Sequence, residues 1–229
     1  MRTIAIIQAR LGSTRLPGKV FEIIAGRPML AHVIERTRAI VGVNEVVLTV
    51  PDDELTAFAA AELGVRLETG PELDVLQRYK LAAEAAGADR IVRITGDCPL
   101  LDPYVAADVI ELSNANPAAP YVSNVWPKAM WPDGLDVEVF TLDALKRAHT
   151  DTIGRHPDTP NWAPREHVTS IMRWPGAPCL EAPFDFSYTK WSVDTPGDLA
   201  FVRVIYERLK PGQFRLTDTV RAALEAKDD

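Results

Sequence analysis

Up to about residue 116, the chain alternates short apolar runs with longer amphipathic stretches. The apolar runs have the length and composition of buried strands and cover residues 3–9, 44–50, 65–68 and 89–95. The stretches between and after them have the periodicity of helices and cover residues 28–40, 52–64, 73–87 and 103–116. This alternation predicts an α/β fold with a mostly parallel sheet covered on both faces. In such folds, ligands bind at the carboxyl ends of the strands.

The pattern changes after about residue 120. We expect strands at 121–125 and 135–140, on either side of the Trp- and Pro-rich segment WPKAMWPDG. Residues 150–164 are predicted to form a loop, 179–194 have room for one or two strands, and helices are expected at 195–209 and 216–227. We interpret residues 121–190 as an inserted arm or lid on a single domain that spans residues 1–229, and WPKAMW as a candidate dimer contact.

The composition excludes several classes of protein. The formal net charge of −7 over 229 residues is the opposite of that of a general nucleic-acid binder, so no nucleic-acid partner is expected. The two cysteines, Cys98 and Cys179, form neither a disulfide framework nor a metal-ligand spacing. The apolar run near the N-terminus is too short for a signal peptide or a membrane span. We therefore expect a cytoplasmic protein that does not associate with membranes.

The loop after the first strand, in IIQARLGSTRLPGK, is locally basic although the chain is acidic. It has no acidic residue before Glu22, and its candidate ligand-binding residues are Arg10, Gly12, Ser13, Arg15 and Lys19. Exposed backbone N–H groups beside Arg and Lys suit phosphate oxygens. The spacing matches neither a P-loop nor GxGxxG, so spacing alone supports a solvated loop equally well.

Two carboxylates follow other strand-like runs. Asp97, in ITGDCPLLDP, comes after the strand predicted at 89–95, where a carboxylate can hold Mg²⁺. Asp194 follows the run WSV, and the sequence leaves open whether it is a second metal ligand or a turn residue. Asp102, just before Pro103, is explained as the N-cap of a helix. Cys98 has no obvious base partner and is expected to be a small buried residue.

The remaining polar candidates carry weaker signals. His32 lies in a predicted helix and is expected to be structural, whereas His167, near Arg165 in PREHVT, is a candidate for pocket lining. Ser13 lacks the context of a nucleophilic serine. Thr195, Pro196 and Asp198 form the pattern of a capping box at the start of a helix.

Taken together, these segments resemble the acylneuraminate cytidylyltransferase family, which makes CMP-sialic acid and CMP-KDO. The resemblance lies in IIQARLGSTRLPGKV, ETGPELDVLQRY, RITGDCPLLDP and SVDTPGDL, which occur in the family's order. With PDGLDVEVF and REHVT, the sequence is most similar to the spore-coat polysaccharide cytidylyltransferase branch. The resemblance implies a Rossmann-like three-layer α/β/α fold, CTP as substrate, Mg²⁺ as cofactor and a homodimer.

The resemblance also implies roles for individual residues. Arg10, Lys19 and Asp97 would be catalytic, with Arg10 and Lys19 on the triphosphate. The nucleotide site would further include Gly12, Ser13, Arg15, Asp74, Arg78 and Gly96. Asp97 would be the main metal ligand and Asp194 a possible second. The acceptor side would include Arg165, His167 and Lys190.

The function predicted on this basis is transfer of CMP from CTP to a sugar, expected to be acidic, with release of pyrophosphate, for cell-surface or spore-coat polysaccharide. Two alternatives remain at this stage. One is a metal-dependent glycosyltransferase that consumes a nucleotide-sugar, and the other is a non-catalytic subunit that binds a nucleotide or a sugar.

Overall fold

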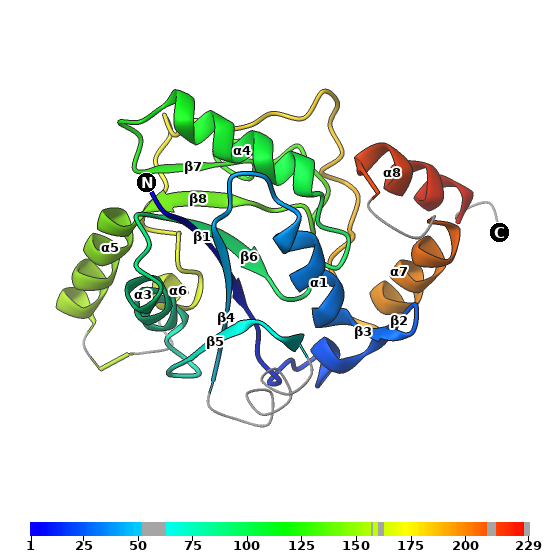
Figure 1. The fold of residues 1–229 in the computed structure, drawn as a ribbon, viewed down its shortest axis with the longest axis horizontal. Helices are drawn as coiled ribbons and strands as arrows, with labels where there is room; N and C mark the ends of the chain where they lie inside the picture. The colour runs from blue at the N-terminus through cyan, green and yellow to red at the C-terminus, as the bar shows by residue number, and fades with distance from the viewer. Residues whose placement is uncertain (52–62, 157, 160–162, 210–213, 227–229) are drawn as a thin grey trace.

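The computed structural model describes residues 1–51, 63–156, 158–159, 163–209 and 214–226. Its main sheet has the strand order β5-β4-β1-β6-β8-β7 within these residues (Figure 1). The strands are β1 (Thr3–Gln8), β4 (Glu45–Val50), β5 (Arg66–Thr69), β6 (Arg90–Thr95), β7 (Tyr121–Ser123) and β8 (Glu138–Thr141). The β1–β4, β1–β6 and β4–β5 pairs are parallel, and β8 runs antiparallel to both β6 and β7. The predicted α/β fold with a mostly parallel sheet is confirmed.

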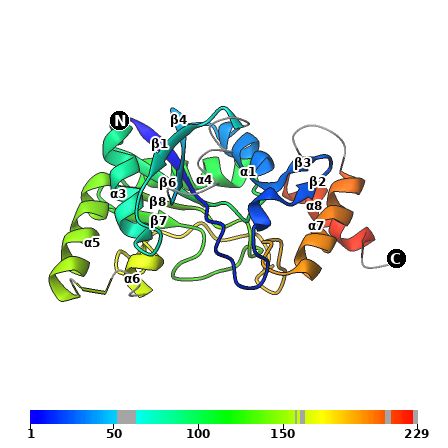
Figure 2. The same ribbon diagram turned by 90° about the horizontal axis from the view of Figure 1, so that it is seen from below.

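Side chains alternate across β1 and enter two separate cores. Ala5 and Ile7 pack into a core that also contains residues of α1 (Met29–Arg38) and α4 (Pro103–Ala115). Ile4 and Ile6 pack into a second core with α3 (Val75–Ala85) and α5 (Leu142–Arg155). Because successive side chains on a strand point to opposite faces, a central strand that is buried on both sides reads as a continuous apolar run. The three-layer arrangement can be followed in Figure 2.

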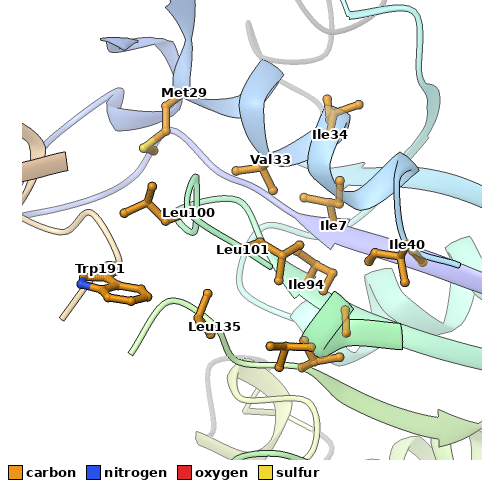
Figure 3. Close-up of a cluster of buried hydrophobic side chains, with 14 of the residues drawn as sticks. Ile7, Met29, Val33, Ile34, Ile40, Ile94, Leu100, Leu101, Leu135 and Trp191 are labelled. Atoms are coloured by element: carbon orange, nitrogen blue, oxygen red, sulfur yellow. The ribbon is translucent and has the colours of Figure 1, made fainter. Parts of the chain in front are cut away.

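The first core continues beyond the sheet toward the C-terminal half of the chain. Figure 3 shows Ile7 and Ile94 near Val33, with Leu135 and Trp191 farther along the same cluster. This packing ties the loops around residues 135 and 191 to the central sheet. It therefore fixes the position of the segment that leads to Asp194.

Local capping sets the starts of several helices. Asp102 accepts a hydrogen bond from the backbone N–H of Tyr104 at 2.8 Å, as predicted for the N-cap of α4. Thr195 and Asp198 form the predicted capping box of α7 (Pro196–Arg208), which α8 (Leu216–Glu225) follows. The helix predicted at 52–64 lies outside the described residues except for its last two positions.

The second half of the chain departs from the sequence prediction in two places. The prediction of a loop from residue 150 is wrong at its start, because α5 continues to Arg155. Thr152 is fully buried on this helix, and its hydroxyl donates to the carbonyl of His149 at 2.9 Å, so tertiary packing outweighs weak helix propensity here. Within 179–194, the structure has only isolated bridges from Ser123 to Cys179 and from Asp133 to Lys190, instead of strands.

Residues 121–190 are tied into the sheet through β7 and β8 (Figure 1). The short elements of the structure are η1 (Lys19–Phe21), β2 (Ile23–Ile24), β3 (Arg27–Pro28) and α6 (Ala163–Glu166). Cys98 is buried as predicted. His32, expected from the sequence to be structural, is also buried, and its ring bonds the carbonyl of Ile24. No helix in the described part of the chain has the length and apolar character needed to cross a membrane.

Candidate active site

A cavity of about 300 Å³ opens at the carboxyl ends of β1 and β6. Its walls come from the loop that follows β1, the turn that follows β6, helix α3, and the segment around α6. Of the predicted site residues, it brings together Arg10, Gly12, Ser13, Arg15, Lys19, Arg78, Gly96, Asp97, His167 and Asp194. The central expectation, that the basic loop and Asp97 meet at one edge of the sheet, is therefore met by the geometry.

The β1 loop is folded by its own backbone. The carbonyl of Leu11 accepts from the N–H groups of Ser13 at 2.8 Å and Gly18 at 3.2 Å. The hydroxyl of Ser13 accepts from the N–H of Leu16 at 3.3 Å, a turn contact that fits the absence of a nucleophile context. Gly18 has φ +67°, a left-handed conformation that glycine adopts without strain, and it leads into η1, where Lys19 is buried.

The amine of Lys19 joins three segments of the chain. Its Nζ donates to Asp97 Oδ2 at 2.7 Å, to the carbonyl of Val193 at 2.7 Å and to Asp194 Oδ1 at 3.0 Å. Lys19 is only 9% exposed. One cationic nitrogen thus lies between two carboxylates that are far apart in the sequence.

Backbone contacts explain why the two carboxylates meet. The N–H of Gly96 donates to the carbonyl of Gln8 at 2.8 Å, and the N–H of Val193 donates to the carbonyl of Asp97 at 2.9 Å. A Cβ on residue 96 would lie 2.9 Å from the carbonyl oxygen of Gln8, so this close approach of β6 to β1 requires glycine. The turn after β6 is consequently fixed between β1 and the strand-like segment before Asp194.

The charges in this cluster stabilise one another. Burial lowers the pKa of Lys19, but the charge of Asp97 and the hydrogen bonds to Asp97 and Asp194 outweigh burial, so the pKa is raised above its ordinary value. Burial acts to raise the pKa of Asp194, but hydrogen bonds from Lys190 and Lys19 outweigh it and lower that pKa to about 2. The Lys19 amine is therefore charged and the Asp194 carboxyl ionised at neutral pH.

The donor set around Lys19 fits Mg²⁺. Asp97 and Asp194 present oxygen atoms to a single cation, which in this structure is the amine of Lys19. Within the described residues, no group of three or more His, Cys, Asp or Glu side chains is arranged to hold a metal ion. Mg²⁺ does not need such a group, because it is usually bound by one or two carboxylates together with water and substrate phosphates.

The two arginines of the β1 loop have acidic partners at the cavity. Arg10 Nη2 lies 3.1 Å from Glu166 Oε1, and Arg15 Nη2 lies 3.1 Å from Asp194 Oδ1. Both arginine side chains are well exposed. Exposed ion pairs contribute little to stability, so the cost of exchanging these partners for phosphate oxygens is small.

Several predicted site residues have structural partners. Asp74 is buried, accepts from the N–H of Gln77 as the N-cap of α3, and pairs with the buried Arg165. Neither Asp74 nor Arg165 lines the cavity among the described residues. Arg78 does line it, and its Nη1 donates to the carbonyls of Pro71 at 3.1 Å and Glu72 at 2.9 Å.

The other two acceptor-side candidates differ in position. His167 lines the cavity and follows α6 directly. Lys190 lies outside the cavity lining and donates to Asp194 Oδ2 and Asp198 Oδ2, both at 2.9 Å. Within the described residues, Lys190 therefore reaches the carboxylate cluster only through its contact with Asp194 and does not line the cavity.

Sequence reasoning missed five polar residues of the cavity, namely Gln8, Thr14, Arg93, Thr95 and Glu166. Arg93 had a readable signal: it is a charged residue inside the apolar run RIVRIT, and period-two alternation puts it on the same face as Thr95. Glu166 lies in α6, more than 150 residues from its partner Arg10, so no local pattern could have connected them.

Comparison with known proteins identifies the class of protein to which this fold and site belong. A model of a family described as cytidylyltransferase matches residues 4–158, about two thirds of the chain. The chain belongs to the cytidylyltransferase family. The predicted class of nucleotidyltransferase is thereby confirmed.

Individual relatives agree with this assignment. A 3-deoxy-manno-octulosonate cytidylyltransferase of Geobacter sulfurreducens is 41% identical over 120 residues, which cover 52% of this chain and 48% of the relative. The chain thus spans about half the length of the curated relatives it matches first.

Solved structures extend the similarity to the whole chain. A cytidylyltransferase from Leptospira borgpetersenii superposes with a TM-score of 0.87 at 26% identity, covering 100% of this chain and 96% of the other. A CMP:2-keto-3-deoxy-manno-octonic acid synthetase complexed with CTP superposes with a TM-score of 0.68 at 20% identity, covering 90% and 99%. This second likeness shows the shared nucleotidyltransferase fold.

Proposed function

We propose that the protein transfers CMP from CTP to the hydroxyl group of an acidic sugar and releases pyrophosphate. The observation that carries the proposal is the convergence of Lys19, Asp97 and Asp194 beside the basic β1 loop. The relative from Geobacter sulfurreducens, whose printed name is that of a cytidylyltransferase acting on a sugar acid, supports the same reaction. By motif resemblance, the product would enter cell-surface or spore-coat polysaccharide, and the protein would act as a homodimer.

In this reaction, an oxygen of the sugar attacks the α-phosphorus of CTP. A bond forms between that oxygen and the phosphorus, the bond to the bridging oxygen breaks, and the hydroxyl proton passes to solvent. Positioning and charge neutralisation are the main demands on the protein in such transfers. Arg10, Arg15 and Lys19 would neutralise the triphosphate and the departing pyrophosphate.

Asp97 and Asp194 would hold Mg²⁺ against the triphosphate. When bound, Mg²⁺ supplies Lewis-acid polarisation of the phosphoryl oxygens. Lys19 would then shift from the two carboxylates toward phosphate oxygens, because its flexible stem allows the amine to change partners. The exposed guanidinium groups of Arg10 and Arg15 would likewise exchange Glu166 and Asp194 for phosphate.

The test is a pyrophosphate-release assay with each of the four ribonucleoside triphosphates, Mg²⁺, and a panel of acidic and neutral sugars. We expect CTP to support turnover with at least one sugar acid, and Asp97→Asn to remove that turnover. Asp89→Asn is the matched control, because Asp89 is exposed at the opposite end of β6 and should leave the rate unchanged.

The same assay separates the alternatives. Consumption of a nucleotide-sugar without pyrophosphate release would assign the cavity to a glycosyltransferase. Tight CTP binding with no turnover on any sugar would assign it to a non-catalytic subunit.

A further inference from the structure

Strand β6 carries an arginine that the proposed transfer of CMP does not use. Arg93 is in register with Glu138 of β8, and its Nη1 donates to Glu138 Oε2 at 2.6 Å. The Arg93 side chain is 15% exposed, and the residue lines the cavity together with Thr95. Holding a charged group at the wall of a cavity costs desolvation free energy. An apolar residue could fill the same space without that cost, so packing alone does not explain an arginine here.

The carboxylate that holds Arg93 is shared. Glu138 is 1% exposed and also accepts from Tyr121 Oη at 2.6 Å, Thr169 Oγ1 at 2.7 Å and Arg173 Nη2 at 2.8 Å. Two guanidinium groups therefore share one carboxylate, which leaves the group with one excess positive charge. The four donors also fix the orientation of Glu138 and, through it, that of Arg93.

Arg93 keeps donor capacity after bonding Glu138. Only its Nη1 is hydrogen-bonded to a described residue, so Nη2 has no partner there, and the buried Nε has none either. Burial lowers the pKa of Arg93, but the charge of Glu138 outweighs burial, so the pKa stays above its ordinary value and the guanidinium remains charged. A guanidinium fork with free donors is well matched to a carboxylate.

The hydrogen bond that orients Arg93 lies on the side of β6 that faces away from β1. Helix α3 lies against β1, β4 and β5, and the phosphate-binding loop follows β1. Arg93 instead bonds toward β8, which adjoins β6 on the side away from β1. The space beside Arg93 is adjacent to Asp97 and extends from the β1 loop toward β8, as expected for the molecule that attacks the nucleotide.

We propose that Arg93 binds the carboxylate group of the acceptor sugar and so selects sugar acids over neutral sugars. This inference rests on the proposed cytidylyl transfer and adds the residue that recognises the acceptor. Glu138 is the positioning residue for Arg93.

One nearby acid could oppose an anionic ligand. Asp136 precedes Glu138 by two residues, and burial together with the charges of Asp133 and Glu138 raises the pKa of Asp136 to about 7. A large share of this carboxyl is therefore protonated near neutral pH. The raised pKa of Asp136 therefore makes it oppose an anionic ligand less than an ordinary aspartate would at neutral pH.

The test compares Arg93→Met with Arg173→Met in the full chain. Both changes remove one guanidinium from Glu138, but Arg173 is not among the described residues that line the cavity. The acceptors are a panel of sugar acids that includes 3-deoxy-manno-octulosonate, the C1 methyl ester of each, and neutral aldoses. Pyrophosphate release gives the KM for the acceptor and the KM for CTP separately.

We expect the wild type to prefer free acids over their esters, and Arg93→Met to raise the KM for the acid about tenfold to a hundredfold. The KM for CTP should stay within about twofold, and the KM for the ester should hardly change. Arg173→Met should leave the preference for acids intact. Arg93→Lys keeps the positive charge but loses the two-pronged guanidinium, so its KM for the acid should lie between those of the wild type and Arg93→Met. This variant serves as the test if Arg93→Met does not fold.

Two results would overturn the inference while leaving cytidylyl transfer in place. One is turnover by the wild type with neutral sugars or esters as good as with acids. The other is an equal rise in acceptor KM for Arg93→Met and Arg173→Met, which would show that both act only by holding Glu138. Absence of pyrophosphate release with every sugar would instead contradict the proposed function itself.

Discussion

The residue on which most of the site depends is Lys19. Its amine joins the β1 loop, Asp97 and the Val193–Asp194 segment at one point. It contacts two carboxylates in the structure, and in the proposed reaction it balances phosphate charge. Both roles need a cation at the end of a flexible side chain.

We therefore predict that Lys19→Met lowers kcat for pyrophosphate release by about a hundredfold or more, the loss typical of removing one charge-stabilising donor. The measurement is steady-state kinetics at saturating CTP and sugar. Thermal unfolding of the same variant checks that the fold survives. A kcat within a few fold of the wild type would remove Lys19 from the proposed chemistry.

Asp136 provides a prediction for the dependence of stability on pH. Burial, followed by the charges of Asp133 and Glu138, raises its pKa from the ordinary value of 3.8 to about 7 in the folded protein. Below the lower value, both the folded and the unfolded state bind the proton. As pH rises toward the higher value, only the unfolded state releases it freely, so the folded state loses stability relative to the unfolded state.

Asp136→Asn removes this penalty. We expect the variant to gain on the order of 1–2 kcal/mol in free energy of unfolding relative to the wild type at about pH 8, and much less at about pH 4. Urea unfolding of the metal-free protein at both pH values measures the difference. Asp151→Asn, on an exposed position of α5, is the control. A gain that is equal at the two pH values would contradict the assigned titration.

At the scale of elements, the site depends on how closely β6 approaches β1. Gly96 sits where a side chain would meet the backbone of Gln8 at 2.9 Å and Cβ of Ala9 at 3.1 Å. Because the opposing atoms include backbone, they cannot rotate away, and a Cβ would push the Asp97 turn from the sheet edge.

We predict that Gly96→Ala lowers the free energy of unfolding by about 1–3 kcal/mol, as overpacking does, and weakens CTP binding at the same time. Gly154→Ala is the matched control, since Gly154 lies in α5, has no atom within 4 Å of an added Cβ, and should be neutral or slightly stabilising. Chemical unfolding and CTP titration of both variants measure these effects. Equal stability of the two variants would show that β6 can move away from β1 at no cost.

Elements that local pattern defines were predictable from the sequence. The apolar runs of β1, β4 and β6, the N-cap at Asp102 and the capping box at Thr195 all follow from neighbouring residues. The end of α5 and the lack of strands near residue 185 could not be predicted from neighbouring residues. They depend on the burial of Thr152 and on contacts with distant loops. Arg10, Lys19 and Asp97 follow predicted strands, and this position was enough to predict that they meet. The pairs Arg93–Glu138 and Arg10–Glu166 depend on tertiary folding alone.

At the scale of the whole molecule, one sheet edge collects residues from most of the chain. The cavity draws on the β1 loop, α3, the turn after β6, the α6 segment and the stretch before α7. The two hydrophobic cores hold these parts against opposite faces of the same sheet. Binding of a ligand that bridges them should therefore stabilise the whole fold, because only the native state presents the complete site.

Thermal unfolding with nucleotides gives the corresponding prediction. CTP with Mg²⁺ should raise the midpoint temperature of unfolding as its concentration increases. At a concentration a hundred times the Kd, CTP should add about 2.7 kcal/mol to the free energy of unfolding. Other nucleoside triphosphates should stabilise the protein less. A midpoint that is unaffected by any nucleotide would argue against a nucleotide site in the cavity.

The central claim is that Asp97 and Asp194 together hold Mg²⁺ against a triphosphate gathered by the β1 loop. Calorimetric titration of CTP, with and without Mg²⁺, tests it in the wild type, in Asp97→Asn, in Asp194→Asn and in the control Asp89→Asn. The account predicts that Mg²⁺ strengthens CTP binding by about tenfold or more in the wild type and the control, and that this gain is lost in both site variants. A gain from Mg²⁺ that survives in Asp97→Asn and Asp194→Asn would contradict it.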